Sequence, residues 1–155
     1  MADLTIGDIA PDFELPRDGG GTVSLKAFSG KSVVLYFYPK DDTEACTKEA
    51  ISFTALLGDF EKAGAPVIGV SPDGVKKHDK FAKKHALSVI LAADEDTSLA
   101  NLYGVWKEKS MYGRTYMGVE RTTFLIGADG RIARIWPKVK VKGHAEEVLE
   151  SLKAL

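Results

Sequence analysis

The pattern of hydrophobic and polar positions predicts a series of short buried strands. The clearest is "SVVLYFY" at 32–38, a continuous apolar and aromatic run with the length of a central strand. Similar apolar runs occupy 65–71 and 88–93, and a short strand followed by a turn is expected in 22–30. The segment "TTFLIGADGRIARIW" at 122–136 predicts a β-hairpin, because an Asp-Gly pair divides its two apolar halves.

Segments with helical periodicity separate these strands. In residues 46–64 the large apolar side chains recur at i, i+3, i+4 and i+7, which places them on one face of a helix. A second helix is expected over 71–87, with Ser71 as its cap and Pro72 at its first position. Two further helices are expected at 96–104 and 143–155. This alternation predicts an α/β fold with helices on both faces of a sheet, and the middle of the chain resembles a thioredoxin-type sheet.

The composition is that of one globular domain covering 1–155. A chain of 155 residues with 45% hydrophobic side chains can bury a sizeable core. Its net charge of -1 gives no electrostatic reason to expect nucleic acid or an anionic membrane as partner. No apolar run is long enough to span a bilayer, and the first residues lack the apolar segment of a secretory signal. We therefore expect a cytoplasmic protein.

Several motifs that resemble ligand sites are better explained as structure. "GKS" at 30–32 lacks the earlier glycine of a phosphate loop and precedes its strand, so a turn is expected. "DGGG" at 18–21 has no helix behind it and predicts a hairpin turn, while the basic and apolar alternation of 131–142 indicates a solvated strand face. His78 and His85 are expected on a helix face, since one cysteine and scattered histidines give no zinc-site spacing. We expect neither a metal nor a cofactor.

Cys46 is the only cysteine of the chain, which excludes both a disulfide framework and a C-x-x-C dithiol site. A free cysteine is more often a small buried hydrophobe than a catalyst. Here, however, Asp41, Asp42 and Thr43 are candidate helix caps, so Cys46 is expected in the first turn of a helix. Free amide groups and the positive end of the helix dipole favour the thiolate there, and the thiolate is the nucleophile. This position, just beyond a central strand, is also where α/β folds place their sites.

Three blocks of the chain, in order, resemble the peroxiredoxins. "PKDDTEAC" at 39–46 has the pattern P-x-x-x-T-x-x-C of the active-site signature of that family. "IGDIAPDFELP" at 6–16 resembles its opening segment, and "GVERTTFLIGADGRI" at 118–132 resembles the later segment that carries a catalytic arginine, here Arg121. The sequence around Cys46 is most similar to that of the bacterioferritin-comigratory, or Q-type, branch of this family. The resemblance implies a single-domain thioredoxin-like fold with a central mixed sheet, flanking helices and an N-terminal extension.

The resemblance also implies a thiol-dependent peroxidase that reduces hydrogen peroxide, organic hydroperoxides or both. Cys46 would attack the peroxide and become a sulfenic acid. Arg121 would stabilise the sulfur and a peroxide oxygen, Thr43 would orient the peroxide and contact the sulfur, and Pro39 would shield the pocket from water. Glu49, one turn after Cys46, would position Arg121. Each residue also has a purely structural alternative. Arg121 could be a surface arginine and Thr43 a simple helix cap. Pro39 could be a strand terminator and Glu49 a solvated helix acid.

Two departures from the family pattern affect the expected cycle. Glu44-Ala45 stand where the branch usually has a small pair such as Pro-Gly, and Ile51 stands where many members have a resolving cysteine. The next helix holds no cysteine either, so the sulfenic acid must be reduced from outside, by an external thiol or by Cys46 of a second subunit. We expect the external thiol, in a one-cysteine mechanism, because two shielded sulfurs would meet with difficulty. Thioredoxin, glutaredoxin and glutathione are the candidate reductants. We expect a monomer, with a small homodimer as the alternative.

Two other classes of function fit parts of the sequence. One is a non-catalytic thioredoxin-fold binding module or holdase in which Cys46 is merely packed, and its thiol would react slowly with alkylating agents. The other is a thiol transferase acting on glutathione mixed disulfides, which would exchange disulfides without a preference for peroxide. The ordered set of Pro39, Thr43, Cys46 and Arg121 favours the peroxidase over both.

Overall fold

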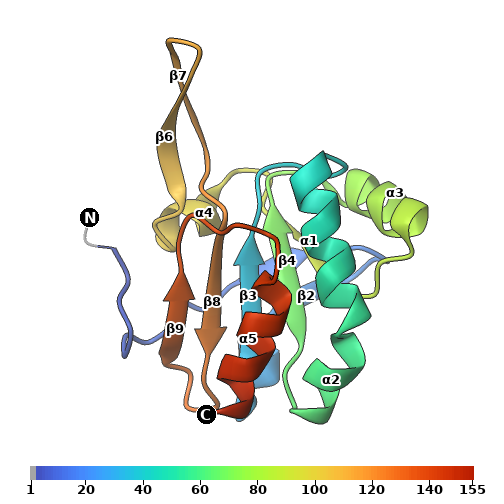
Figure 1. Cartoon of the computed structure of the whole chain (residues 1–155), viewed down its shortest axis with the longest axis vertical. Coiled ribbons are helices and arrows are strands. Elements are labelled where there is room, and N and C mark those ends of the chain that lie inside the picture. The colour runs from blue at the N-terminus through green and yellow to red at the C-terminus, as the bar shows by residue number, and fades with distance from the viewer. Residues whose placement is uncertain (1–2) are drawn as a thin grey trace.

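The computed structural model describes residues 3–155 and is built around a five-stranded mixed sheet with the order β5-β4-β3-β8-β9 (Figure 1). Strands β3, β4 and β5 run parallel, and β8 pairs antiparallel with both β3 and β9. The strands are β3 (Val33–Phe37), β4 (Val67–Ser71), β5 (Ile90–Ala93), β8 (Thr122–Ile126) and β9 (Ile132–Trp136). The predicted central strands and the predicted hairpin are therefore confirmed.

Alternation along β3 divides the core into two apolar clusters. Val34 and Tyr36 belong to one cluster and Leu35 and Phe37 to the other, because successive side chains of a strand point to opposite faces. Every residue of this strand is buried, since elements cover the sheet on both sides. The continuous apolar run thus has the physical cause that the sequence pattern suggested.

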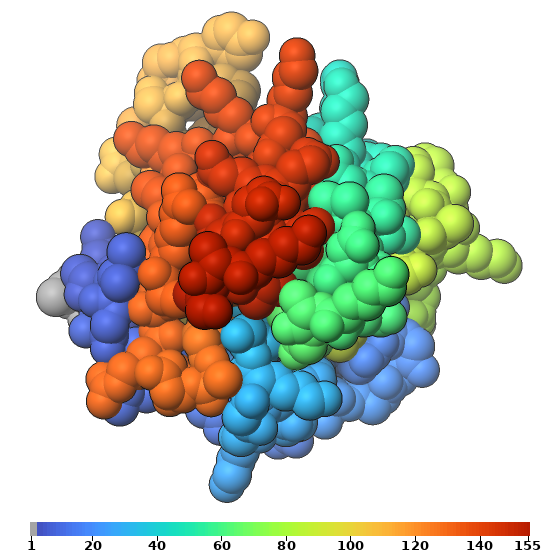
Figure 2. Space-filling view, turned by 60° about the horizontal axis from the view of Figure 1, so that its bottom comes forward, coloured from blue at the N-terminus to red at the C-terminus, as the bar shows by residue number. Residues whose placement is uncertain are grey.

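Four helices cover the face on which the cysteine lies. They are α1 (Glu44–Ala55), α2 (Leu57–Lys62), α3 (Val75–His85) and α5 (His144–Lys153). Figure 2 shows α5, in dark red, between the orange strands β8 and β9 and the green α2. Within residues 3–155, no helix has both the length and the apolar character needed to cross a bilayer.

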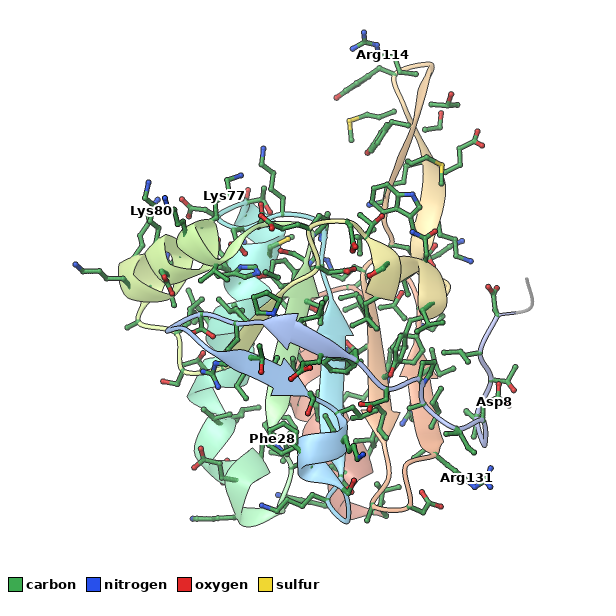
Figure 3. The ribbon with its side chains drawn as sticks, turned by 180° about the vertical axis from the view of Figure 1, so that it is seen from behind. Asp8, Phe28, Lys77, Lys80, Arg114 and Arg131 are labelled. Carbon is green, nitrogen blue, oxygen red and sulfur yellow. The ribbon has the colours of Figure 1, made fainter. Side chains whose placement is uncertain are left out.

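The opposite face is covered by one short helix and by the N-terminal part of the chain. Figure 3, seen from behind, shows the two-stranded N-terminal hairpin lying across the sheet. The elements are β1 (Glu14–Pro16), β2 (Thr22–Ser24), the 3-10 helix η1 (Lys26–Phe28) and α4 (Ser98–Leu102). The predicted turn at 18–21 joins β1 to β2, and the predicted placement of helices on both faces is confirmed by α4.

The bounds of two predicted helices are wrong. The helix expected over 46–64 is two helices, α1 and α2, separated at Leu56, where φ is -99° and ψ is 4°. The helix expected from Ser71 begins at Val75, with Gly74 at its N-cap. Ser71 instead ends β4, where it pairs with Ala93, and its hydroxyl bonds the Asp73 carboxylate at 2.8 Å. Pairing within the sheet therefore outweighs the local capping preference.

A second hairpin was not predicted from the sequence. Strands β6 (Trp106–Met111) and β7 (Arg114–Val119) form a two-stranded ribbon that projects beyond the main sheet, with Arg114 at its tip (Figures 1 and 3). Tyr112 and Gly113 make its turn with positive φ of 52° and 77°, as a two-residue hairpin requires. Most of its side chains are partly or fully exposed, so no hydrophobic alternation marks it in the sequence.

Candidate active site

The loop after β3 delivers the cysteine to the start of a helix. Thr43 occupies the N-cap of α1 in an extended conformation, and Cys46 is the third residue of the helix. The side chain points into the core and is only 1% exposed. The sulfur therefore lies in the first helical turn, where unpaired backbone amides and the helix dipole stabilise a negative charge.

Arg121 reaches the sulfur from the residue just before β8. Its Nη2 donates to Cys46 Sγ at 3.2 Å, and its Nη1 donates to Glu49 Oε1 at 2.7 Å. Burial opposes the guanidinium charge, but the negative groups of Glu49 and Cys46 raise the pKa of Arg121 on balance. The Arg121 carbonyl also accepts a hydrogen bond from the Val139 amide at 2.9 Å, which fixes the start of the strand. One permanently charged guanidinium thus joins two acidic groups of α1.

Glu49 is a buried acid. Only 1% of the residue is exposed, and its Oε2 has no hydrogen-bond partner among the described residues. Burial raises the pKa of Glu49 to about 7, although the charge and the hydrogen bond of Arg121 lower it. The interpretation of Glu49 as a solvated helix acid is therefore wrong, since its carboxyl lies in the interior beside Arg121.

Thr43 and Pro39 lie on the loop but make no hydrogen bond to the sulfur within residues 3–155. The Thr43 hydroxyl donates to the Lys40 carbonyl at 3.0 Å, and it makes no capping bond to the helix. Among residues 3–155 the hydroxyl makes no hydrogen bond to Cys46, and its role toward the sulfur stays a prediction. Pro39 is half-buried and comes two residues after Phe37, the last residue of β3. Of the five predicted site residues, the structure brings Cys46, Arg121 and Glu49 into direct contact.

A buried network holds this loop and was not predicted from the sequence. Asp41 accepts from the Tyr38 hydroxyl at 2.5 Å and from His78 Nδ1 at 2.7 Å, while His78 Nε2 lies 2.9 Å from the Ala92 carbonyl. Because a carbonyl and a carboxylate can only accept, this arrangement suits an imidazole with a proton on each ring nitrogen, which is the cationic form. Burial lowers the pKa of His78, but Asp41 and the Ala92 carbonyl raise it on balance. The network ties the loop before Cys46 to α3 and β5.

A groove leads from the surface to Arg121. It has a volume of about 810 Å³ and runs between the first half of α1 and the segment 139–143. Figure 2 shows this red-orange segment beside the turquoise end of α1. Apolar side chains of Ile51, Val139 and Val141 line it, together with three lysines. The predicted strand face over 131–142 is wrong beyond Trp136, since β9 ends there and the rest forms one wall of the groove.

Two other hollows are remote from the cysteine. These smaller ones, of about 340 and 230 Å³, lie at the opposite end of the sheet and contain none of the predicted site residues. Among residues 3–155, no cluster of three or more His, Cys, Asp or Glu side chains is arranged to hold a metal ion. The chemistry that the described residues support is therefore centred on Cys46, Arg121 and Glu49.

Comparisons with known proteins give one consistent result. The AhpC/TSA family model matches residues 6–135. The chain is 49% identical to the peroxiredoxin Bcp of Bacillus subtilis, over 97% of this chain and 96% of that protein. It is 42% identical to the peroxiredoxin Bcp of Escherichia coli, over 99% of this chain and 98% of that protein.

Solved structures agree with these relatives. A structure of peroxiredoxin Q from Xanthomonas campestris has a TM-score of 0.90 at 46% identity, covering 97% of this chain and 96% of that one. A structure of the bacterioferritin comigratory protein of the same organism, from work on its alkyl peroxide reduction activity, has a TM-score of 0.89 at 45% identity with the same coverage.

Proposed function

Because the chain belongs to the AhpC/TSA family, whose relatives similar to it over its whole length are peroxiredoxins, we propose that it is a thiol peroxidase acting through Cys46. One observation carries the assignment of the site. The Arg121 guanidinium lies 3.2 Å from a sulfur that is buried in the first turn of α1. Two sources of positive potential thus converge on the single thiol of the chain, as a nucleophilic thiolate requires.

The reaction follows from this geometry. The Cys46 thiolate attacks the terminal oxygen of a hydroperoxide, the S–O bond forms and the O–O bond breaks. The attacked oxygen keeps its hydrogen and gives a sulfenic acid, while the other oxygen leaves as water or an alcohol after taking up a proton. Arg121 can donate to the peroxide oxygens as charge moves onto them, since a guanidinium has several donors in one plane.

The roles of Thr43 and Pro39 remain part of this proposal. The Thr43 hydroxyl now bonds the Lys40 carbonyl. Rotation about χ1 would free it to orient a peroxide near the helix start, because a threonine hydroxyl can both donate and accept. Pro39 has no N–H group and is half-buried, so it limits the hydration of the pocket without adding a donor.

The groove supports organic hydroperoxides as substrates alongside hydrogen peroxide. Its apolar side chains, including Ile51 and Val141, can contact an alkyl group while the peroxide end meets Arg121. The similar protein of Xanthomonas campestris is described by its alkyl peroxide reduction activity, which agrees with this substrate class.

The reductant is proposed to be an external thiol. No second cysteine exists in the chain, and Ile51, which is 45% exposed, occupies the position five residues after Cys46. The sulfenic acid would therefore form a mixed disulfide with glutathione, glutaredoxin or thioredoxin, and the protein would act as a monomer. A cytoplasmic setting fits this cycle, since thiols are kept reduced there.

The test is a Cys46→Ser variant compared with the wild type. We expect peroxide consumption with dithiothreitol as reductant to disappear, because a hydroxyl of similar size is not ionised at neutral pH. The urea midpoint of unfolding should stay close to that of the wild type, which serves as the folding control. Intact mass after one equivalent of peroxide should show one added oxygen in the wild type only. Peroxide turnover retained by the serine variant would contradict the proposal.

A further inference from the structure

Two buried acids of α1 depend on a single cation. Cys46 and Glu49 are each 1% exposed, and Arg121 donates to both, at 3.2 Å and 2.7 Å. Within residues 3–155, no second lysine, arginine or histidine makes a hydrogen bond or ion pair with either group. If both acids were ionised together, the interior would hold two negative charges against one positive charge. Uncompensated charge in a buried site is strongly unfavourable, so one of two such groups keeps a proton.

The carboxyl of Glu49 has a place for that proton. Oε1 accepts from Arg121, whereas Oε2 is buried without any hydrogen-bond partner among the described residues. A bare carboxylate oxygen in that position would lack both water and a donor. A neutral carboxyl with its hydrogen on Oε2 lowers this cost, because burying an unpaired neutral hydroxyl is less unfavourable than burying an unpaired charge. The pKa of Glu49, raised to about 7 by burial, agrees with a carboxyl that is neutral just below that pH.

We propose that Cys46 and Glu49 share one proton across Arg121. While the sulfur is a thiolate, Glu49 holds the proton and is neutral. When the sulfur is oxidised, Glu49 loses this proton and becomes a carboxylate. This inference rests on the proposed peroxidase function. Glu49 acts through Arg121 and not on the peroxide itself, and it is therefore a positioning residue for the charge of the site.

The proton count of the oxidation follows directly. The thiolate attacks ROOH, the sulfur is oxidised by two electrons, and the products are the sulfenic acid and RO⁻, which takes a proton to become ROH. Oxidation removes the negative charge of the sulfur, so Glu49 is the one acidic group among residues 3–155 that remains bonded to Arg121. Glu49 then ionises and releases one proton, which balances the proton taken by RO⁻. The site stays neutral, and the solution shows no net uptake of protons.

Three other titratable groups face the pair, from three different elements. Tyr36 on β3 stays neutral, because burial raises its pKa well above the usual value. His144 on α5 also stays neutral, because burial lowers its pKa to about 4. Lys109 on β6 has its pKa lowered by burial and by Arg121, and it makes no bond to either acid. Between about pH 6 and about pH 8, the proton count is therefore set by the pair itself.

The experiment counts protons during a single oxidation. Reduced protein is mixed with one equivalent of tert-butyl hydroperoxide in weakly buffered indicator solution, from about pH 6 to about pH 8. The thiolate fraction is measured separately by its ultraviolet absorbance. For the wild type, we expect the number of protons taken up per protein to be well below the thiolate fraction at the lowest pH. This number should rise toward one proton per thiolate at the highest pH. For Glu49→Gln, uptake should equal the thiolate fraction at every pH, since an amide has no proton to release.

Two controls separate the possible results. Glu44→Gln, in an exposed acid of the same helix that bonds Lys48, should give the wild-type proton count. Infrared difference spectra of the wild type alone should show that oxidation removes the carbonyl stretch of a protonated carboxyl, which keeps the test valid if Glu49→Gln does not fold. The proposal of a shared proton would be overturned if the wild type took up protons equal to its thiolate fraction at every pH and lost no carboxyl band. Absence of any added oxygen at Cys46 would instead overturn the proposed function.

Discussion

The buried cation of His78 makes a stability prediction that depends on pH. The side chain is fully buried, and its two ring nitrogens bond the Asp41 carboxylate and the Ala92 carbonyl at 2.7 and 2.9 Å. Replacing it in His78→Ala leaves the Asp41 carboxylate buried with the Tyr38 hydroxyl as its one remaining hydrogen-bond donor among residues 3–155. Removing one partner of a buried ion pair costs about 3–5 kcal/mol of unfolding free energy. For a chain of 155 residues, this corresponds to a fall in Tm of about 10 °C.

The sign of the pH dependence follows from the direction of the His78 pKa, which is raised above 6.5 in the folded protein. The folded state therefore binds the proton more tightly than the unfolded state does. The stabilisation is complete below about pH 6.5 and declines as the pH rises through the folded pKa. A neutral imidazole cannot donate from both nitrogens, so above that pH one of its two acceptors loses its donor. At high pH, the remaining difference in unfolding free energy between the wild type and His78→Ala comes from the packing of the ring.

Urea unfolding of the wild type and His78→Ala, at several pH values between about 6 and 9, measures this difference directly. His85→Ala is the matched control, because His85 lies on the same helix and bonds the exposed carboxylate of Asp42 at 2.9 Å. It should cost less than about 1 kcal/mol. Tyr38→Phe should cost about 1.5–3 kcal/mol, as expected for a hydrogen bond to a charged group. Equal losses for His78→Ala and His85→Ala, or a His78 difference that does not shrink with pH, would refute the reasoning.

Two further predictions concern the reaction itself. Arg121→Ala should slow the oxidation of Cys46 by about two orders of magnitude, as for the loss of a donor to a developing charge, and stopped-flow rates at matched thiolate fraction measure this. Arg121→Lys should restore only part of the rate, because an ammonium lacks the planar pair of donors, and full rescue would contradict the bidentate role. Glutathione added after one equivalent of peroxide should convert the singly oxidised protein to a glutathione adduct, whereas excess peroxide without thiol should add a second oxygen and abolish activity. An oxidised protein that stays unreactive to every thiol, by intact mass, would exclude the one-cysteine cycle.

The parts of the fold that could be predicted are those with local causes. The apolar run at 32–38 marks β3 because both of its faces are covered, and the Asp-Gly pair marks the turn between β8 and β9. The position of Cys46 at a helix start also follows from neighbouring residues. By contrast, the start of α3 depends on Ser71 pairing with β5, and the exposed β6–β7 ribbon has no hydrophobic pattern to announce it.

The candidate site shows the same division. Arg121 and Glu49 could be named from the resemblance, but their contact joins residues 72 positions apart and only the fold brings them together. The pairing of Asp41 with His78 spans 37 positions, and a helix-face histidine gives no sign of its partner. The hydroxyl of Thr43 could bond several neighbours, and the local turn gives it the Lys40 carbonyl. Side-chain partners across long separations are thus set by packing, which a periodicity pattern does not record.

The rate at which reagents label the single thiol can report the width of the groove that ends at Arg121. Since Cys46 is the only cysteine and is almost fully covered, a thiol-directed reagent can react at one atom only, and the groove beside Arg121 is the path that we expect it to take. Labelling rates measured with a homologous series of haloacetamides, whose substituents increase in width, would therefore depend on the width of this path. The size at which labelling stops would report the narrowest passage between α1 and the segment 139–143 in solution. The same series, repeated with Ile51 replaced by a smaller or larger side chain, would show how far this one residue sets the aperture.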